Sequence, residues 1–199
     1  DIPATGMLPG KFEPALISEE ELCANAARVR KVAVNEVRSS GDDFIDDVVW
    51  QKTLEEVSKG WLIGPLDENS VSEDRPPLSR RFGLRQRADK VRLIDDYSES
   101  GVNASVTVTE LPMLHTVDVA CATLMVWFSL CREANVDSSL AVRTFDLASA
   151  YRQVGLSKKG RQFAYLRVFN PETRRACFFK SLVLPFGAVR SVHSLDRKS

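Results

Sequence analysis

Thr144-Phe145-Asp146-Leu147-Ala148-Ser149-Ala150-Tyr151 is the stretch that decides which fold is predicted for this chain. A hydrophobic strand that ends on one acidic residue presents that carboxylate at a sheet edge, where a divalent cation can be held. Tyr151, five residues after Asp146, falls about one helical turn past the strand end, on the same side as the carboxylate. Two further apolar runs follow and lead to Leu184-Pro185-Phe186-Gly187. The stretch therefore predicts a polar site built around Asp146 at the edge of a sheet.

The pattern on either side predicts an α+β fold with a mostly antiparallel sheet. A capping box at Ser18 to Glu21 and helical spacing of apolar residues after Asp43 predict that residues 1–65 are a helical N-terminal extension. The Pro-rich residues 66–79 are predicted as a loop, and residues 80–199 carry the motifs. Within them we expect a helix from about 112 to 134 and strands at 81–86, 90–94, 141–145, 163–169 and 176–184. The last three strands are expected to share one sheet, with Asp146 at its edge.

Composition narrows the class of protein. Hydrophobic residues make up 44% and charged residues 27% of the chain, which is ordinary for a soluble globular protein. Because no apolar run approaches the roughly 20 residues of a membrane span, we expect no membrane partner. The four cysteines have no CxxC spacing and there are two histidines, a pattern that argues against zinc and favours a reducing compartment, hence an intracellular location, cytoplasmic or nuclear. The chain starts at Asp1 without a secretory signal, so we expect a piece of a longer protein.

Charge is unevenly spread although the formal net charge is zero. From residue 141 onward there are twelve Lys and Arg against three Asp and Glu, and residues 75–92 hold seven basic residues against Asp89 alone. Two basic segments that flank an acidic site suit a polyanion laid across the fold. The alternative is a solvated surface whose charges balance between neighbours.

A second informative run is Lys90-Val91-Arg92-Leu93-Ile94-Asp95-Asp96-Tyr97, which continues to Asn103. A planar guanidinium on a strand that faces the site is suited to bidentate phosphate contact, which makes Arg92 a candidate for binding phosphate. The alternative for Arg92 is a surface ion pair with Asp95 or Asp96. For Asp146 the alternative is a helix N-cap for residues 148–154, and for Tyr151 it is an aromatic of the core.

Together the two runs resemble the fingers and palm of reverse transcriptases of retrotransposon type, over about residues 80–192. In that family the first catalytic aspartate is followed by an aromatic that screens the incoming sugar, and a Leu-Pro-x-Gly turn follows a β-hairpin. The resemblance implies that Asp146 is catalytic and binds Mg²⁺, and that Tyr151 is the sugar gate. The other residues that it implies in contact with the dNTP are Arg92, Phe186 and Gly187, the last as a point of close backbone approach.

The resemblance also implies a template-primer of RNA or DNA as partner. A basic residue on the fingertip hairpin, either Arg87 or Lys90, would contact the nucleic acid, and Arg161 is a further candidate. Solvated turn charge is the alternative for Arg161.

One part of the family's pattern is missing. The family completes its metal site with an aromatic-x-Asp-Asp hairpin after the Leu-Pro-x-Gly turn, whereas the only acidic residue after Gly187 is Asp196. One carboxylate does not hold two hard cations at catalytic geometry, so we expect this chain alone to be inactive. The sequence thus predicts a fragment of a retroelement RNA-directed DNA polymerase, whose further partner would be the remaining C-terminal part of the same polyprotein. The alternatives are a non-catalytic nucleic-acid-binding or interaction remnant of such an element, and an unrelated α+β domain in which Asp146 caps a helix.

Overall fold

A computed structural model of the chain describes residues 14–66, 68, 71, 76–108, 117–137, 140, 143, 147–188 and 191. The chain divides into two compact units, one formed by Asp1–Leu111 with Ser149–Ser199 and the other by Pro112–Ala148. The described helix of the second unit is α4 (Val117–Glu133). All other helices and strands described below belong to the first unit.

Two helices begin the first unit, and both start within one residue of the position that the sequence indicates. Helix α1 (Glu19–Asn35) is capped by Ser18, whose Oγ accepts a hydrogen bond from the Glu21 amide at 3.1 Å. Helix α2 (Asp43–Ser58) is capped by Asp42, whose Oδ1 accepts from the Ile45 amide at 3.3 Å. Gly60, with a φ of +71°, follows the end of α2 and lets the chain turn into the sheet.

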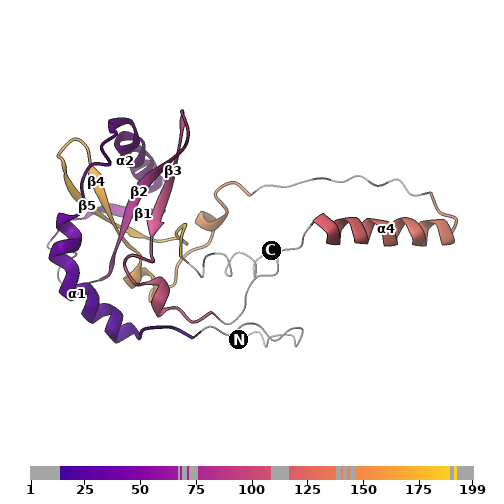
Figure 1. The fold of residues 1–199 in the computed structure, drawn as a ribbon, viewed down its shortest axis with the longest axis horizontal. Helices are drawn as coiled ribbons and strands as arrows, with labels where there is room; N and C mark the ends of the chain where they lie inside the picture. The colour runs from indigo at the N-terminus through magenta and orange to yellow at the C-terminus, as the bar shows by residue number, and fades with distance from the viewer. Residues whose placement is uncertain are drawn as a thin grey trace. The chain divides into compact units, whose positions relative to one another are not determined.

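A mixed sheet of five strands forms the centre of the unit (Figure 1). Its strands are β1 (Leu62–Leu66), β2 (Leu78–Arg87), β3 (Lys90–Asp96), β4 (Tyr165–Asn170) and β5 (Arg175–Ser181), in the spatial order β1-β5-β4-β2-β3. The pairs β1–β5, β5–β4 and β2–β3 are antiparallel, and the pair β2–β4 is parallel. The chain is therefore α+β, as the sequence predicts.

The sheet packs on both faces, because alternate residues of a strand point to opposite sides. Leu166 and Phe179 lie in one core cluster with Trp50 of α2. Their sequence neighbours Tyr165 and Phe178 lie in the other cluster, against which Val34 of α1 packs. Thus α2 covers one face of the sheet, and the C-terminal part of α1 contributes to the other.

Two expectations about this region need correction or stay open. Residues 1–65 are not wholly helical, because β1 forms at their end and pairs with β5. The expected strand at 141–145 lies, except for residue 143, outside the described residues. Of the three strands expected to share one sheet, the two that correspond to β4 and β5 do so as an antiparallel pair.

Candidate nucleotide-binding site

The two runs that the sequence analysis singled out meet at the ring of Phe186. The guanidinium of Arg92, on β3, lies over this ring with its Cζ 4.4 Å from the ring centroid. Tyr151 approaches the same ring edge-on, with centroids 5.3 Å apart and planes inclined by 75°. Both contacts have the geometry in which aromatic rings attract a cation or another ring. Phe186 is thus the common neighbour of Arg92 and Tyr151.

Gly187 holds this turn against β3. Its φ is +110°, and a Cβ atom at this position would lie 2.4 Å from the backbone oxygen of Asp95. Asn103 adds a second tie, because its Nδ2 donates to the Gly187 carbonyl at 3.1 Å. Within the described residues, the close approach that requires glycine is therefore one of the turn to β3. The expected approach to a nucleotide or template base stays a prediction.

A buried ionic network lies next to this cluster. Arg81 of β2 donates to both carboxylate oxygens of Asp95, from Nε at 2.6 Å and from Nη2 at 3.0 Å, and from Nη1 to Glu56 at 2.8 Å. The side chains of Arg81 and Asp95 are 0% and 1% exposed. Burial by itself lowers the pKa of the Arg81 guanidinium, but Asp95 and Glu56 outweigh it and raise that pKa above its usual value. The Arg81 guanidinium is therefore held in its charged form.

Arg152 completes the network from the far end of the sequence. It lies on the 3₁₀ helix η2 (Ala150–Gln153) and donates from Nη2 to Glu56 Oε2 at 3.0 Å. The same Nη2 lies 2.7 Å from Glu56 Oε1 and 3.6 Å from Asp95 Oδ2. Two arginines thus face two carboxylates, and the buried charges sum to zero. Because Arg152 follows Tyr151 directly, the network is joined through the backbone to the cluster around Phe186.

This network was not predicted from the sequence, where Asp95 was weighed only as an alternative partner of Arg92. Asp95 pairs with Arg81 rather than with Arg92, and Asp96 Oδ1 accepts hydrogen bonds from the amides of Ser98 and Glu99. The hairpin signal alone could not have revealed the first pair. A regular register that starts from Arg87 and Lys90 places residue 96 opposite residue 81, and an irregularity between Arg85 and Arg87 shifts the pairing to residue 95. No local signal pointed to Glu56 or Arg152.

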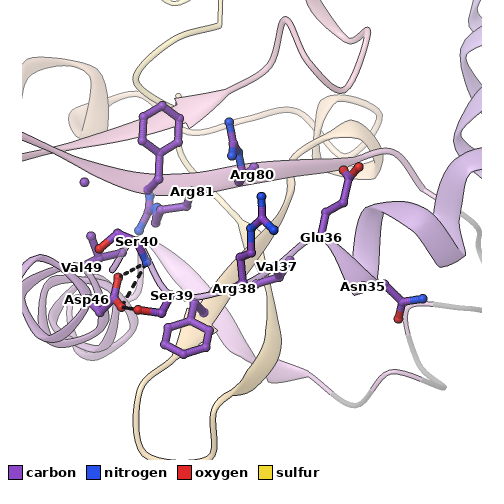
Figure 2. Close-up of a pocket in the computed structure, with 13 residues that line it drawn as sticks. Asn35, Glu36, Val37, Arg38, Ser39, Ser40, Asp46, Val49, Arg80 and Arg81 are labelled. Atoms are coloured by element: carbon purple, nitrogen blue, oxygen red, sulfur yellow. Dashed lines mark hydrogen bonds between the residues drawn. The ribbon is translucent and has the colours of Figure 1, made fainter. Parts of the chain in front are cut away.

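A cleft of about 650 Å³ opens on the face of β2 near the end of α1 (Figure 2). Arg38 extends from the loop after α1 toward β2 (Figure 2). Arg80 lies with its Cζ 4.9 Å from the ring centroid of Phe82, and its Nε is 3.0 Å from Glu99 Oε2. Asp46 fixes the opposite rim, because it accepts hydrogen bonds from Ser39 Oγ and from the Ser40 amide at 2.5 and 3.1 Å. The side chains that line the cleft include Arg38, Arg80, Phe82 and Phe169.

The other residues expected in the site either lie apart from the cluster around Phe186 or are not among the described residues. Asp146 is not among the described residues, so its place in the site stays a prediction. Arg87 and Lys90 are exposed partners at the tip of the β2–β3 hairpin, and the structure does not choose between them. Arg161 lies on η3 (Gly160–Phe163) and donates from Nε to the Leu156 carbonyl at 3.0 Å, a contact within its own turn.

In the described part of the chain, no group of three His, Cys, Asp or Glu side chains is placed to hold a metal ion. The thiols of Cys23, Cys121, Cys131 and Cys177 are all free. None of the described helices is long and apolar enough to cross a membrane.

Comparison of the chain with models of known protein families and with curated proteins found no match. What the site can do is therefore inferred from its own side chains.

Proposed function

We propose that the chain forms the fingers and the first part of the palm of a retroelement RNA-directed DNA polymerase, and that the cluster around Phe186 binds the incoming dNTP. One observation carries the proposal. Arg92 and Gly187 are ninety-five positions apart in the sequence, yet the turn that holds Phe186 and Gly187 lies against β3 and under the Arg92 guanidinium. Two motifs that the resemblance assigns to one nucleotide site therefore form one surface.

The contact between Arg92 and Phe186 suits triphosphate binding. A guanidinium presents its five N–H donors in its own plane, so stacking of one face on a ring leaves these donors available. Arg92 is exposed and Phe186 is 37% exposed, which keeps the stacked pair open to a ligand. Such a fork can bind two phosphate oxygens at once.

The position of Tyr151 supports the proposal that the sugar of the nucleotide lies beside its ring. Its ring contacts Phe186 edge-on, and the Arg92 guanidinium lies over the same Phe186 ring. A nucleotide whose phosphates bind Arg92 would therefore meet an aromatic wall formed by Phe186 and Tyr151. A bulky wall at that place can exclude a 2′-hydroxyl by its volume alone. This is the function that the resemblance implies for Tyr151.

The cleft beside Arg80 suits a single strand of nucleic acid. Guanidinium groups and aromatic rings on one surface are typical of sites that bind phosphates and stack bases without reading their sequence. Arg38 and Arg80 provide the charge, and Phe82 and Phe169 provide the rings. The cleft is therefore proposed as a contact for the template strand, with Arg87 or Lys90 at the hairpin tip as a further contact.

Mg²⁺ belongs to the proposal for the complete enzyme, with Asp146 as the one ligand named in this sequence. The described residues supply no set of ligands of their own for it. When bound, the ions would activate the 3′-hydroxyl and stabilise the leaving pyrophosphate. The described side chains hold the nucleotide and the strand.

A binding experiment tests the nucleotide site. The affinity of the purified chain for a fluorescent dNTP is measured with Arg92→Ala, Arg92→Lys and the control Arg28→Ala, which removes an exposed arginine of α1 that contacts Asn25. Loss of charge-assisted hydrogen bonds is expected to weaken binding by roughly 10- to 100-fold in Arg92→Ala. Arg92→Lys should lie in between, because it keeps the charge without the planar fork. Equal affinities of Arg92→Ala and Arg28→Ala would exclude the nucleotide site.

The second candidate function is binding of single-stranded nucleic acid without chemistry, and the cleft favours it. An oligonucleotide titrated at several salt concentrations measures this function, with Arg80→Ala and Phe82→Ala as variants. Both should weaken binding, and Arg80→Ala should also reduce its salt dependence. Oligonucleotide binding without dNTP binding would favour this second function over the first.

A further inference from the structure

Glu56 connects parts of the unit that are distant in sequence. Its Oε2 accepts from Arg81 Nη1 at 2.8 Å and from Arg152 Nη2 at 3.0 Å, and its Oε1 forms an ion pair with the same Arg152 Nη2 at 2.7 Å. Glu56 lies on α2, Arg81 on β2 and Arg152 on η2. This one carboxylate therefore ties the short η2 helix to the sheet and to the helix that covers it.

The side chains of η2 divide between this network and the candidate site. Successive residues of a 3₁₀ helix point about 120° apart. Arg152 is buried in the network, whereas Tyr151, one residue earlier, contacts the exposed ring of Phe186. A rotation of η2 that moved Arg152 away from Glu56 would therefore also carry Tyr151 away from Phe186.

The network is better suited to fixing a geometry than to adding stability. Replacing a buried ion pair by apolar side chains of similar volume is often neutral or stabilising. The two-point contact of Arg81 with Asp95, together with Arg152 Nη2 placed between the two carboxylates, fits in contrast in few arrangements. A backbone hydrogen bond ties the end of η2, where the Val154 carbonyl accepts from the Leu184 amide at 2.8 Å.

We propose that Arg152 is a positioning residue, which the Glu56 and Asp95 carboxylates hold so that Tyr151 stays against Phe186 beside Arg92. This placement rests on the contacts of the network and not on the function of the site. The consequence for sugar discrimination rests on the proposed nucleotide site. Arg152 itself touches no ligand in this proposal and acts through its neighbour.

Fluorine NMR tests the placement directly. The chain has three tyrosines, Tyr97, Tyr151 and Tyr165, so 3-fluorotyrosine labelling gives three signals, which single Tyr→Phe variants assign. Arg152→Met should shift and broaden the Tyr151 signal and leave that of Tyr165, which lies on β4 away from the network. The control Arg28→Met, with the same change on an exposed face of α1, should shift neither signal. An unchanged Tyr151 signal in folded Arg152→Met would overturn the proposal.

Two further variants keep the test decisive if Arg152→Met does not fold. Arg152→Lys retains the charge but not the fork, and Glu56→Gln retains the shape of its partner but not the charge. Each should shift the Tyr151 signal by less than Arg152→Met, and the double variant should add little to either single one, because both act through the same contact. Additive shifts, or none, would contradict the coupling.

The consequence for function is measured as a ratio of affinities. The preference of the chain for a dNTP over the corresponding NTP should fall by roughly tenfold in Arg152→Met, since a small misplacement of a positioning group costs about this much or more. Partial unfolding lowers both affinities equally and leaves their ratio unchanged. An unchanged ratio together with a shifted Tyr151 signal would overturn the functional half of the proposal. If the unsubstituted chain binds no dNTP, the proposed function fails while the NMR result still decides the placement.

Discussion

The tightest backbone contact of the candidate site predicts a large effect for a single methyl group. In Gly187→Ala the new Cβ would lie 2.4 Å from the Asp95 carbonyl oxygen. A carbon–oxygen contact normally comes no closer than about 3.3 Å, so the overlap is about 0.9 Å, and the obstacle is backbone that cannot rotate aside. The φ of +110° adds strain, because side chains rarely adopt it. Overlap and strain each contribute about 1–3 kcal/mol, so the free energy of unfolding should fall by about 2–6 kcal/mol.

Gly60→Ala is the matched control. Gly60 also has a positive φ, +71°, but a Cβ there would meet nothing within 4 Å. Its substitution should cost only the left-handed conformation, about 1–2 kcal/mol. The difference between the two variants isolates the contact between the turn and β3 from the general cost of a positive φ.

Urea unfolding followed by circular dichroism measures both variants, and the midpoint and slope together give the free energy of unfolding. Because the turn also carries Phe186, Gly187→Ala should weaken binding of the fluorescent dNTP as well, and Gly60→Ala should not. A Gly187→Ala variant that is no less stable than Gly60→Ala would refute the reasoning, since the turn would then not depend on its approach to Asp95.

Three further predictions follow from the network, from a buried hydroxyl and from the number of acidic residues. Arg81→Met should lower the free energy of unfolding by about 3–5 kcal/mol, because it leaves buried carboxylates unpaired. The control is Arg85→Met, because the ion pair of Arg85 with Asp42 is about 40% exposed. This control should lower the free energy of unfolding by about 0–1 kcal/mol in the same urea assay. Burial, and next the Asp95 charge, raise the pKa of Tyr97, whose hydroxyl has no hydrogen-bond partner among the described residues. In the unfolded chain Tyr97 ionises above a pH of about 10, whereas in the folded chain it stays neutral there. Its ionisation therefore leaves the free energy of unfolding unchanged below that pH and lowers this free energy as the pH rises above it. Tyr97→Phe should therefore be neutral or stabilising at pH 7 and should flatten the alkaline decline in stability, measured by urea unfolding at several pH values. In primer extension with template, dNTPs and Mg²⁺, the 199-residue chain should bind but not extend; extension that disappears in Asp146→Asn would contradict the count of one metal-binding carboxylate.

Local signals in the sequence predicted much of the fold. The capping box at Ser18 and the helical spacing of apolar residues after Asp43 placed the starts of α1 and α2 within one residue, because both are short-range signals. The tight turn after Arg87 likewise predicted the β2–β3 hairpin. Strand β1 was missed because it is short and contains Gly64 and Pro65, residues that are typical of turns and, within sheets, of edge strands.

Long-range pairings could not be predicted in this way. The parallel contact of β2 with β4 joins segments that are separated by more than eighty residues, and no local pattern encodes it. The same holds for Glu56 and Arg152, which are ninety-six positions apart. For the candidate site, the motifs indicated Arg92, Tyr151, Phe186 and Gly187, but not the ionic network behind them. A charged residue is assigned to the surface from sequence alone, because it is buried only when it is paired and its partner is distant in the sequence.

The strand order also has a consequence for how the protein folds. Among the described strands, β1 pairs with β5, and β2 joins the rest of the sheet through β4. The sheet therefore cannot form from the first three strands before the last two are present. During synthesis the β2–β3 hairpin leaves the ribosome more than sixty residues before β4, and a two-stranded hairpin alone is marginally stable at best. Closing so long a loop before any long-range contact forms slows folding, although the entropy of closure itself rises only slowly with loop length. A nascent chain that pauses between Asp96 and Tyr165 therefore exposes the apolar faces of an unfinished sheet, and this interval is when a chaperone would bind it.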